Sequence, residues 1–170
     1  MFLLQNFVQS VHSIFEQLIM IMSIALAIHI LSIVIWVGGM FFTHQVMRPA
    51  AVATLEPPQR LQLWVAGFKR FFPWVWVCIA AVLITGLWMF FQFPKPPIFM
   101  HIMLGLGIVM IFLFLHVFFA PYNKLKKAVT EERWKDGGAA LNQIRILVGI
   151  NTLIGIITIV IATAGKYFLN

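Results

Sequence analysis

Residues 28–47 read IHILSIVIWVGGMFFTHQVM, an apolar segment with a histidine near each end, His29 and His44. The surrounding run from Gln17 to Met47 contains no Asp, Glu, Lys or Arg. A helix needs roughly 20 apolar residues to cross the hydrocarbon core of a bilayer. This run therefore predicts a membrane-spanning helix that carries two histidines.

The composition of the whole chain points to the same class of protein. Of the 170 residues, 62% are hydrophobic and 10% are charged, whereas a soluble domain is nearer half apolar and a quarter charged. The net charge of +7 comes from basic residues in loops beside apolar spans, where membrane topology explains them. We therefore expect the lipid bilayer as a partner and no nucleic acid. The single cysteine, Cys78, excludes an intrachain disulfide.

Charge-free runs along the chain predict an all-α fold, an integral membrane four-helix bundle that forms one domain over residues 1–170. The loops between the first and second helices and between the third and fourth carry ten basic residues, against two on the other side. Basic loops favour the cytoplasmic side, so both termini are predicted to face outward, into the periplasm of a bacterium with the bundle in its inner membrane. The four helices are predicted at about 14–46, 71–92, 98–120 and 144–168.

The third predicted helix repeats the arrangement of the first. Residues 100–121 read MHIMLGLGIVMIFLFLHVFFAP, with His101 and His116 as far apart as the first two histidines. At 1.5 Å rise per residue, each pair is separated by about 22 Å along its helix. The two helices run in the same direction across the membrane, so His29 is predicted to face His101. In the same way, His44 is predicted to face His116.

Two facing pairs of histidines suit two haems. The first and third helices of an up-and-down bundle are diagonal, at about 12–14 Å, which leaves room for an iron between two imidazoles. Bundle cores hold cofactors, and haem iron accepts histidine as an axial ligand. The sequence thus predicts a membrane b-type cytochrome with two bis-histidine haems b. It would exchange electrons with a quinone or a partner redox protein. Whether it is also an oxidoreductase enzyme stays open, and so does whether the chain forms a homo-oligomer.

Other residue types add to this hypothesis. Glycine permits close approach of a backbone to a porphyrin face, and arginine and lysine suit the haem propionates. No catalytic residue is predicted, because the spans contain no carboxylate pair and no combination of serine, histidine and acid. The glycines are Gly38, Gly39, Gly105 and Gly107; the inner cations are Arg48, Arg70 and Arg145; the outer cations are Lys95 and Lys166.

Two other interpretations of the polar and sulfur-containing residues stay open. Histidines, like Asn151 in the fourth helix, can simply hydrogen-bond between membrane helices. Thioether and imidazole together suit Cu(I), which makes a copper-handling membrane protein the main alternative to a cytochrome. The methionines on the two histidine-bearing helices are Met40, Met47, Met100, Met103 and Met110.

A family resemblance rests on several short elements of the chain. They are His29-Ile-Leu with Trp36-Val-Gly38-Gly39, then Arg70-Phe-Phe, Thr85-Gly86, Arg145, Gly155 and Thr163-Ala164. Over about residues 25–165 the sequence resembles the CopD (copper-resistance D) domain family of four-helix membrane proteins. The resemblance implies a bacterial inner-membrane protein of copper uptake or resistance.

The chain is also distantly similar to the HemJ-type protoporphyrinogen oxidases, four-helix proteins that bind haem b. Their first-helix histidine corresponds to His29. Their third helix carries a histidine-x-lysine element, where this chain has His101-Ile-Met103. This similarity implies a further alternative, oxidation of a porphyrin precursor, from which Met103 departs.

Overall fold

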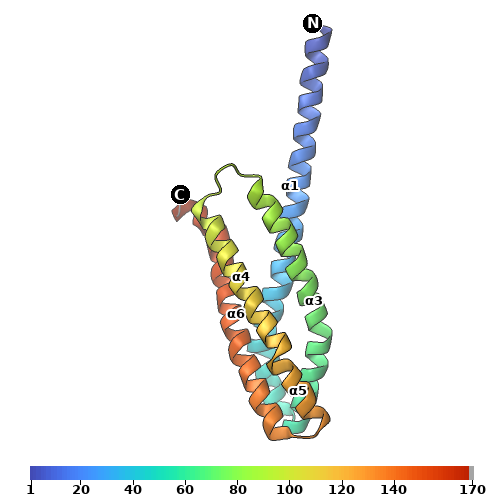
Figure 1. The fold of residues 1–170 in the computed structure, drawn as a ribbon, viewed down its shortest axis with the longest axis vertical. Coiled ribbons are helices and arrows are strands. Elements are labelled where there is room, and N and C mark those ends of the chain that lie inside the picture. The colour runs from blue at the N-terminus through green and yellow to red at the C-terminus, as the bar shows by residue number, and fades with distance from the viewer. Residues whose placement is uncertain (169–170) are drawn as a thin grey trace.

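A computed structural model describes residues 1–168, apart from the side chains of residues 2–4, 8 and 166. The predicted outer cation Lys166 therefore lies outside the described side chains. The elements follow one another along the chain as Figure 1 shows. They are α1 (Phe2–Phe42), η1 (Thr43–Met47), α2 (Arg48–Thr54), α3 (Pro57–Phe91), α4 (Ile98–Phe119), α5 (Pro121–Thr130) and α6 (Trp134–Phe168).

The predicted fold class is confirmed. Within the described residues, four helical stretches are long and apolar enough to cross a membrane: Gln5–Thr54, Pro57–Phe91, Ile98–Thr130 and Trp134–Gly165. The chain is thus an all-α, multi-pass membrane protein. The side of the membrane that each terminus faces stays a prediction.

Three of the helices begin earlier than predicted, and the first of them is α1, which starts at Phe2 rather than near residue 14. α3 starts at Pro57 and α6 at Trp134, because charged residues end an apolar run without ending a helix. At the start of α3, the Glu56 backbone N–H donates to Gln59 Oε1 at 3.2 Å. The Glu56 side chain accepts in return, which completes a capping box, and Pro57 suits the first helical position.

The short helix α5 was not predicted, because its sequence PYNKLKKAVT is too polar to resemble a span. Its apolar side chains nevertheless recur on one face. Tyr122, Leu125 and Ala128 are buried, whereas Lys124 and Lys127 are exposed. The three-residue spacing of these apolar positions in the sequence could have indicated a helix with one buried face.

Between α1 and α2 the backbone forms a single π-helical turn, η1. The backbone N–H of Arg48 donates to the carbonyl oxygen of Thr43, five residues earlier. A π turn inside an α-helix inserts an extra residue and often marks a functional site. The predicted histidine His44 lies in this turn.

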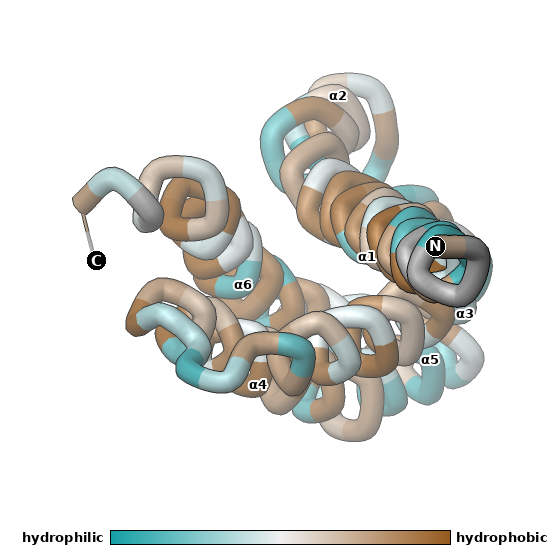
Figure 2. The backbone as a smooth tube through the Cα atoms, turned by 90° about the horizontal axis from the view of Figure 1, so that it is seen from above, coloured by the Kyte–Doolittle hydropathy of each residue, from teal (hydrophilic) through white to brown (hydrophobic). Residues whose placement is uncertain are grey.

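The four long helices form two closely packed pairs. α1 packs along α3, and α4 packs along α6. Viewed along the bundle in Figure 2, α4 lies beside α6, and α1 lies over α3. α6 also contacts α1, so it links the two pairs. The N-terminal part of α1 projects beyond the rest of the bundle in Figure 1.

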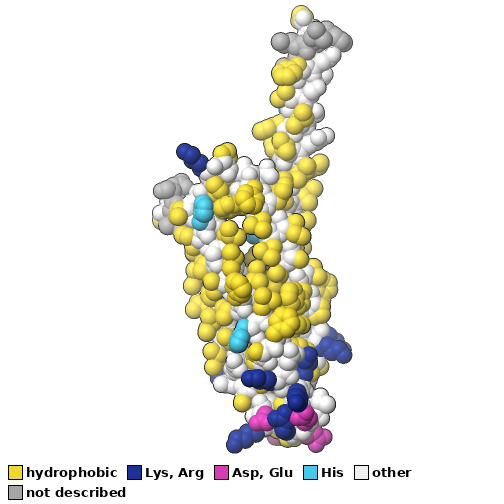
Figure 3. All heavy atoms as spheres, in the orientation of Figure 1, with side chains coloured by type: hydrophobic (Ala, Val, Ile, Leu, Met, Phe, Trp, Pro, Cys, Tyr) yellow, Lys and Arg dark blue, Asp and Glu magenta, His cyan; other side chains and the backbone are white. Residues whose placement is uncertain are grey.

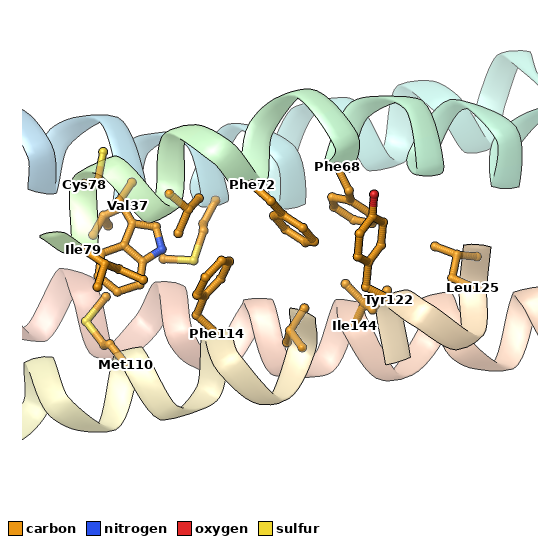
Figure 4. Packing of buried hydrophobic residues seen from close by; sticks show 14 of the residues in the cluster. Val37, Phe68, Phe72, Cys78, Ile79, Met110, Phe114, Tyr122, Leu125 and Ile144 are labelled. Atoms are coloured by element: carbon orange, nitrogen blue, oxygen red, sulfur yellow. The ribbon is translucent and has the colours of Figure 1, made fainter. Parts of the chain in front are cut away.

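The core is rich in aromatic rings. Phe72 of α3 contacts Phe114 of α4 at 5.5 Å between ring centroids, Tyr122 of α5 at 4.8 Å and Phe68 at 5.1 Å. Figure 4 shows these rings between the helices, with Cys78, Val37, Ile79 and Met110 at one end of the group and Leu125 at the other. The contacts of Phe72 with Phe114 and Tyr122 are edge-to-face, whereas Phe68 and Phe72 are stacked; both kinds stabilise packing beyond simple burial.

Charged side chains gather at the end of the bundle that holds α5, as Figure 3 shows. Here Arg133 forms ion pairs with Glu131, at 2.7 Å, and with Asp136. We call this the basic end, since the two loops that carry ten basic residues meet there.

Candidate functional site

The two histidines of α4 face away from the bundle. His101 and His116 are both exposed. His101 places Nδ1 3.2 Å from the carbonyl oxygen of Pro97, and its ring packs edge-on against Phe90 at 5.0 Å. Pro97 directly precedes α4 and Phe90 lies at the end of α3, so neither contact of His101 directs its ring toward α1.

His29 of α1 instead packs onto α3. Its Nδ1 lies 3.0 Å from Thr85 Oγ1. The Thr85 hydroxyl donates to the Ala81 carbonyl oxygen at 2.6 Å, so Thr85 Oγ1 accepts the hydrogen bond from the imidazole. A Cβ atom on Gly86 would lie 2.9 Å from His29 Cε1, so the glycine is what lets the ring approach α3.

The bis-histidine pairing is therefore not supported. His29 turns to α3, and neither histidine of α4 turns toward α1. Equal spacing along two helices fixes the heights of the histidines but not their directions around the helix axes. Fifteen residues rotate by only about 60°, so His101 and His116 lie on nearly the same side of α4, which is the outward side.

The glycines and cations that were predicted to surround the haems do not gather at common sites in the structure. A Cβ atom on Gly39 would lie 2.5 Å from the ring of Phe71, so that side chain fills the space predicted for a porphyrin. Arg70 and Lys95 are exposed, whereas Arg48 and Arg145 are half-buried near His44. A Cβ atom would meet nothing within 4 Å on Gly38, Gly105 or Gly107.

His44, Arg48 and Arg145 line a cavity of about 270 Å³ at the basic end. His44 lies against α6, where a Cβ atom on Gly149 would be 3.1 Å from His44 Nε2. The sequence did not predict Arg60 as a fourth basic member. Apolar side chains form much of the wall. The other lining residues are Thr43, Val52, Pro57, Leu61, Trp64, Phe68, Trp134, Gly138, Leu141, Asn142, Ile144 and Val148.

A second polar group lies deeper, among α1, α4 and α6. Asn151 is only 4% exposed, and its Nδ2 is 3.6 Å from Met40 Sδ and 3.3 Å from the Met110 carbonyl oxygen. The expected interhelical hydrogen bond of Asn151 is thus present. Its Oδ1 is buried and has no hydrogen-bond partner among the described residues. The Met110 methyl group lies 3.1 Å from a Cβ position on Gly155, one turn after Asn151.

The donors on α1 form a line. At about 100° per residue, His29, Met40 and His44 lie within about 60° of one another around the helix axis. No cluster of three or more His, Cys, Asp or Glu side chains occurs in the described part of the chain. The buried donors that lie close together are the Met40 thioether and the Asn151 amide, with the Met110 side chain packed one turn along α6. Their residue types were visible in the sequence, but their convergence depends on how α6 packs between α1 and α4.

The contact between His29 and Thr85 leads to a testable expectation. Thr85→Val keeps the side-chain shape and removes the oxygen that accepts from His29. We expect the free energy of unfolding to fall by about 1 kcal/mol, as is typical of a hydrogen bond between membrane helices. Chemical denaturation in mixed micelles measures the change.

Thr163→Val is the matched control, because within the described part of the chain exposed Thr163 bonds only to carbonyl groups of its own helix. An equal loss of stability in both variants would show that the contact with His29 contributes nothing.

Comparison with known proteins gives one family. Residues 65–164 match the family model described as Copper resistance protein D. Neither curated proteins nor solved structures give a match. The matched segment begins in α3 and ends near the end of α6, so it includes Thr85, Met110, Asn151 and Gly155. Because it covers more than half of the sequence, the chain belongs to the copper resistance protein D family.

Proposed function

We propose that the protein handles copper as a multi-pass protein of the bacterial inner membrane, with the cuprous ion as its substrate. The observation that carries this proposal is the buried group of Met40, Met110 and Asn151. Membership of the copper resistance family supports the same chemistry. The site binds the ion in transit between α1, α4 and α6.

The chemistry of the donors fits a soft monovalent cation. Thioethers favour Cu(I) over harder ions, and both methionine side chains are at least 96% buried. The unpartnered Asn151 Oδ1 carries a partial negative charge. Leaving such an atom unsatisfied inside a protein costs about 1–3 kcal/mol, and a nearby cation would offset that cost.

The line of donors along α1 supplies positions on either side of this group. His29 lies about 16 Å from Met40 along the axis, toward the N-terminal end, and His44 lies about 6 Å away in the other direction. Imidazole also binds copper. We therefore propose that the ion passes along the inner side of α1, with Met40 as the central position.

The first test is Cu(I) binding by the purified full chain in detergent, in competition with a chromogenic Cu(I) chelator. The double variant Met40→Leu/Met110→Leu keeps similar volume and removes both sulfur atoms. We expect its affinity for Cu(I) to fall by about 10-fold to 100-fold, the range seen when residues that support a metal site are substituted. Cell-associated copper, measured in cells that express each variant, should change with the wild type and not with the double variant.

Met20→Leu is the matched control, since Met20 lies on α1 and is 57% exposed. Its Cu(I) affinity is expected to equal that of the wild type. Unchanged binding by the double variant would contradict the site. A red protein whose reduced α band disappears on changing His44 to Ala would instead restore the haem hypothesis.

A further inference from the structure

The cavity at the basic end holds positive charge that has no partner. Arg48, Arg60 and Arg145 line it and are half-buried. Within the described part of the chain, none of the three guanidinium groups takes part in an ion pair or a side-chain hydrogen bond. Partly buried charges without a counter-charge are unfavourable, so the cavity has the electrostatic character of an anion site.

Three of the four acidic residues at this end are already engaged, and the fourth, Glu132, is exposed and does not line the cavity. Glu131 and Asp136 both pair with Arg133. Glu56 closes the capping box at the start of α3. The lining of the cavity contains no Asp or Glu, so no carboxylate of the described residues balances the three arginines inside the cavity.

The remaining lining residues indicate what kind of anion fits. Arginine presents a planar fork of donors that matches phosphate, and Thr43 and Asn142 add further polar groups. The wall also contains Trp64 and Leu141, which suit an apolar chain. At about 270 Å³ the cavity is at the small end of ligand pockets, which suits a headgroup whose chains stay in the bilayer.

We infer that this cavity binds the phosphate headgroup of an anionic phospholipid. Basic pockets between helices at the cytoplasmic surface of a membrane bind such headgroups. The lipid phosphate bridges α2, α3 and α6 through Arg48, Arg60 and Arg145. It also lowers the positive potential beside His44. The inference is independent of copper handling, because it rests on lipid binding alone.

The experiment compares lipids on the purified full chain in detergent, with native mass spectrometry as the readout. Phosphatidylglycerol is expected to stay bound at concentrations at which phosphatidylcholine, with its neutral headgroup, does not. The triple variant Arg48→Gln/Arg60→Gln/Arg145→Gln is expected to lose at least about tenfold in phosphatidylglycerol affinity.

The control triple variant Lys69→Gln/Arg70→Gln/Lys124→Gln removes the same charge from exposed positions at the same end. Its affinity is expected to change less than about twofold, because exposed charges are screened by salt. Equal losses in both triple variants would overturn the inference in favour of general surface attraction.

Two further results also test the site. Arg145→Lys keeps the charge but not the fork, so a partial loss of affinity is expected even if the triple variant folds poorly. Wild-type protein that binds both lipids equally would overturn the inference. Displacement of the lipid by glycerol phosphate at equal concentration would also overturn it, because the site would then recognise a soluble phosphate rather than a lipid.

Discussion

Phe72→Ala is expected to lower the free energy of unfolding by about 3 kcal/mol, at the lower end of the range for buried phenylalanine. The ring of Phe72 contacts rings from α3, α4 and α5. Its removal leaves a cavity where three elements meet. Lipid chains solvate apolar groups well, so the loss comes mainly from dispersion contacts. Denaturation in mixed micelles, followed by circular dichroism, measures it.

Phe112→Ala is the control for this measurement. Phe112 lies on α4 and is 67% exposed, so its removal leaves no cavity inside the bundle. We expect its effect to be under about 0.5 kcal/mol, as for other surface positions. If the two variants lost the same stability, the aromatic group around Phe72 would not be the packed core that the contacts describe.

Gly155→Ala is expected to destabilise the bundle by about 1–3 kcal/mol, as overpacking does in a filled core. The added Cβ would lie 2.7 Å from Val37 Cγ2 and 3.1 Å from Met110 Cε. Val37 is buried and branched at Cβ, so it has little rotational freedom with which to yield. The shift is also expected to weaken Cu(I) binding, since Met110 and Asn151 lie beside this position.

The control is Gly105→Ala, where a Cβ atom meets nothing within 4 Å. Alanine favours a helix over glycine by about 1 kcal/mol, so this variant is expected to be as stable as the wild type or more so. A stabilised Gly155→Ala variant would show that α1 and α4 move apart easily, which would contradict tight packing of α6 between them.

The comparison between sequence and structure shows which features of a membrane protein are readable in advance. The thickness of the bilayer sets the length of an apolar run, so the four spans were predicted. The direction in which each side chain points from its helix could not be predicted. α4 is apolar on every side, so nothing in its sequence distinguishes an outward His116 from an inward one.

The prediction that succeeded for Asn151 depended on the energetic cost of burying an unpaired polar group, and not on the direction in which a side chain points from its helix. Asn151 lies among apolar neighbours, and an amide there needs a partner. Its interhelical hydrogen bond was expected and is present. By contrast, the meeting of Arg60 with Arg48 and Arg145 depends on where α2 folds back. The loop sequence around Glu56 indicates a turn but not its direction.

The π-helical turn at Thr43–Met47 changes the angular position, around the helix axis, of the residues that follow it in α2. One inserted residue amounts to about 100° of rotation in an α-helix. The side chains of α2 therefore do not point in the directions that a continued α1 would give them. The line of donors that includes His29 and Met40 ends at His44. Directly after the turn, Arg48 at the start of α2 contributes a guanidinium group to the cavity at the basic end. The turn thus separates the face of α1 that carries His29 and Met40 from the face of α2 that carries Arg48.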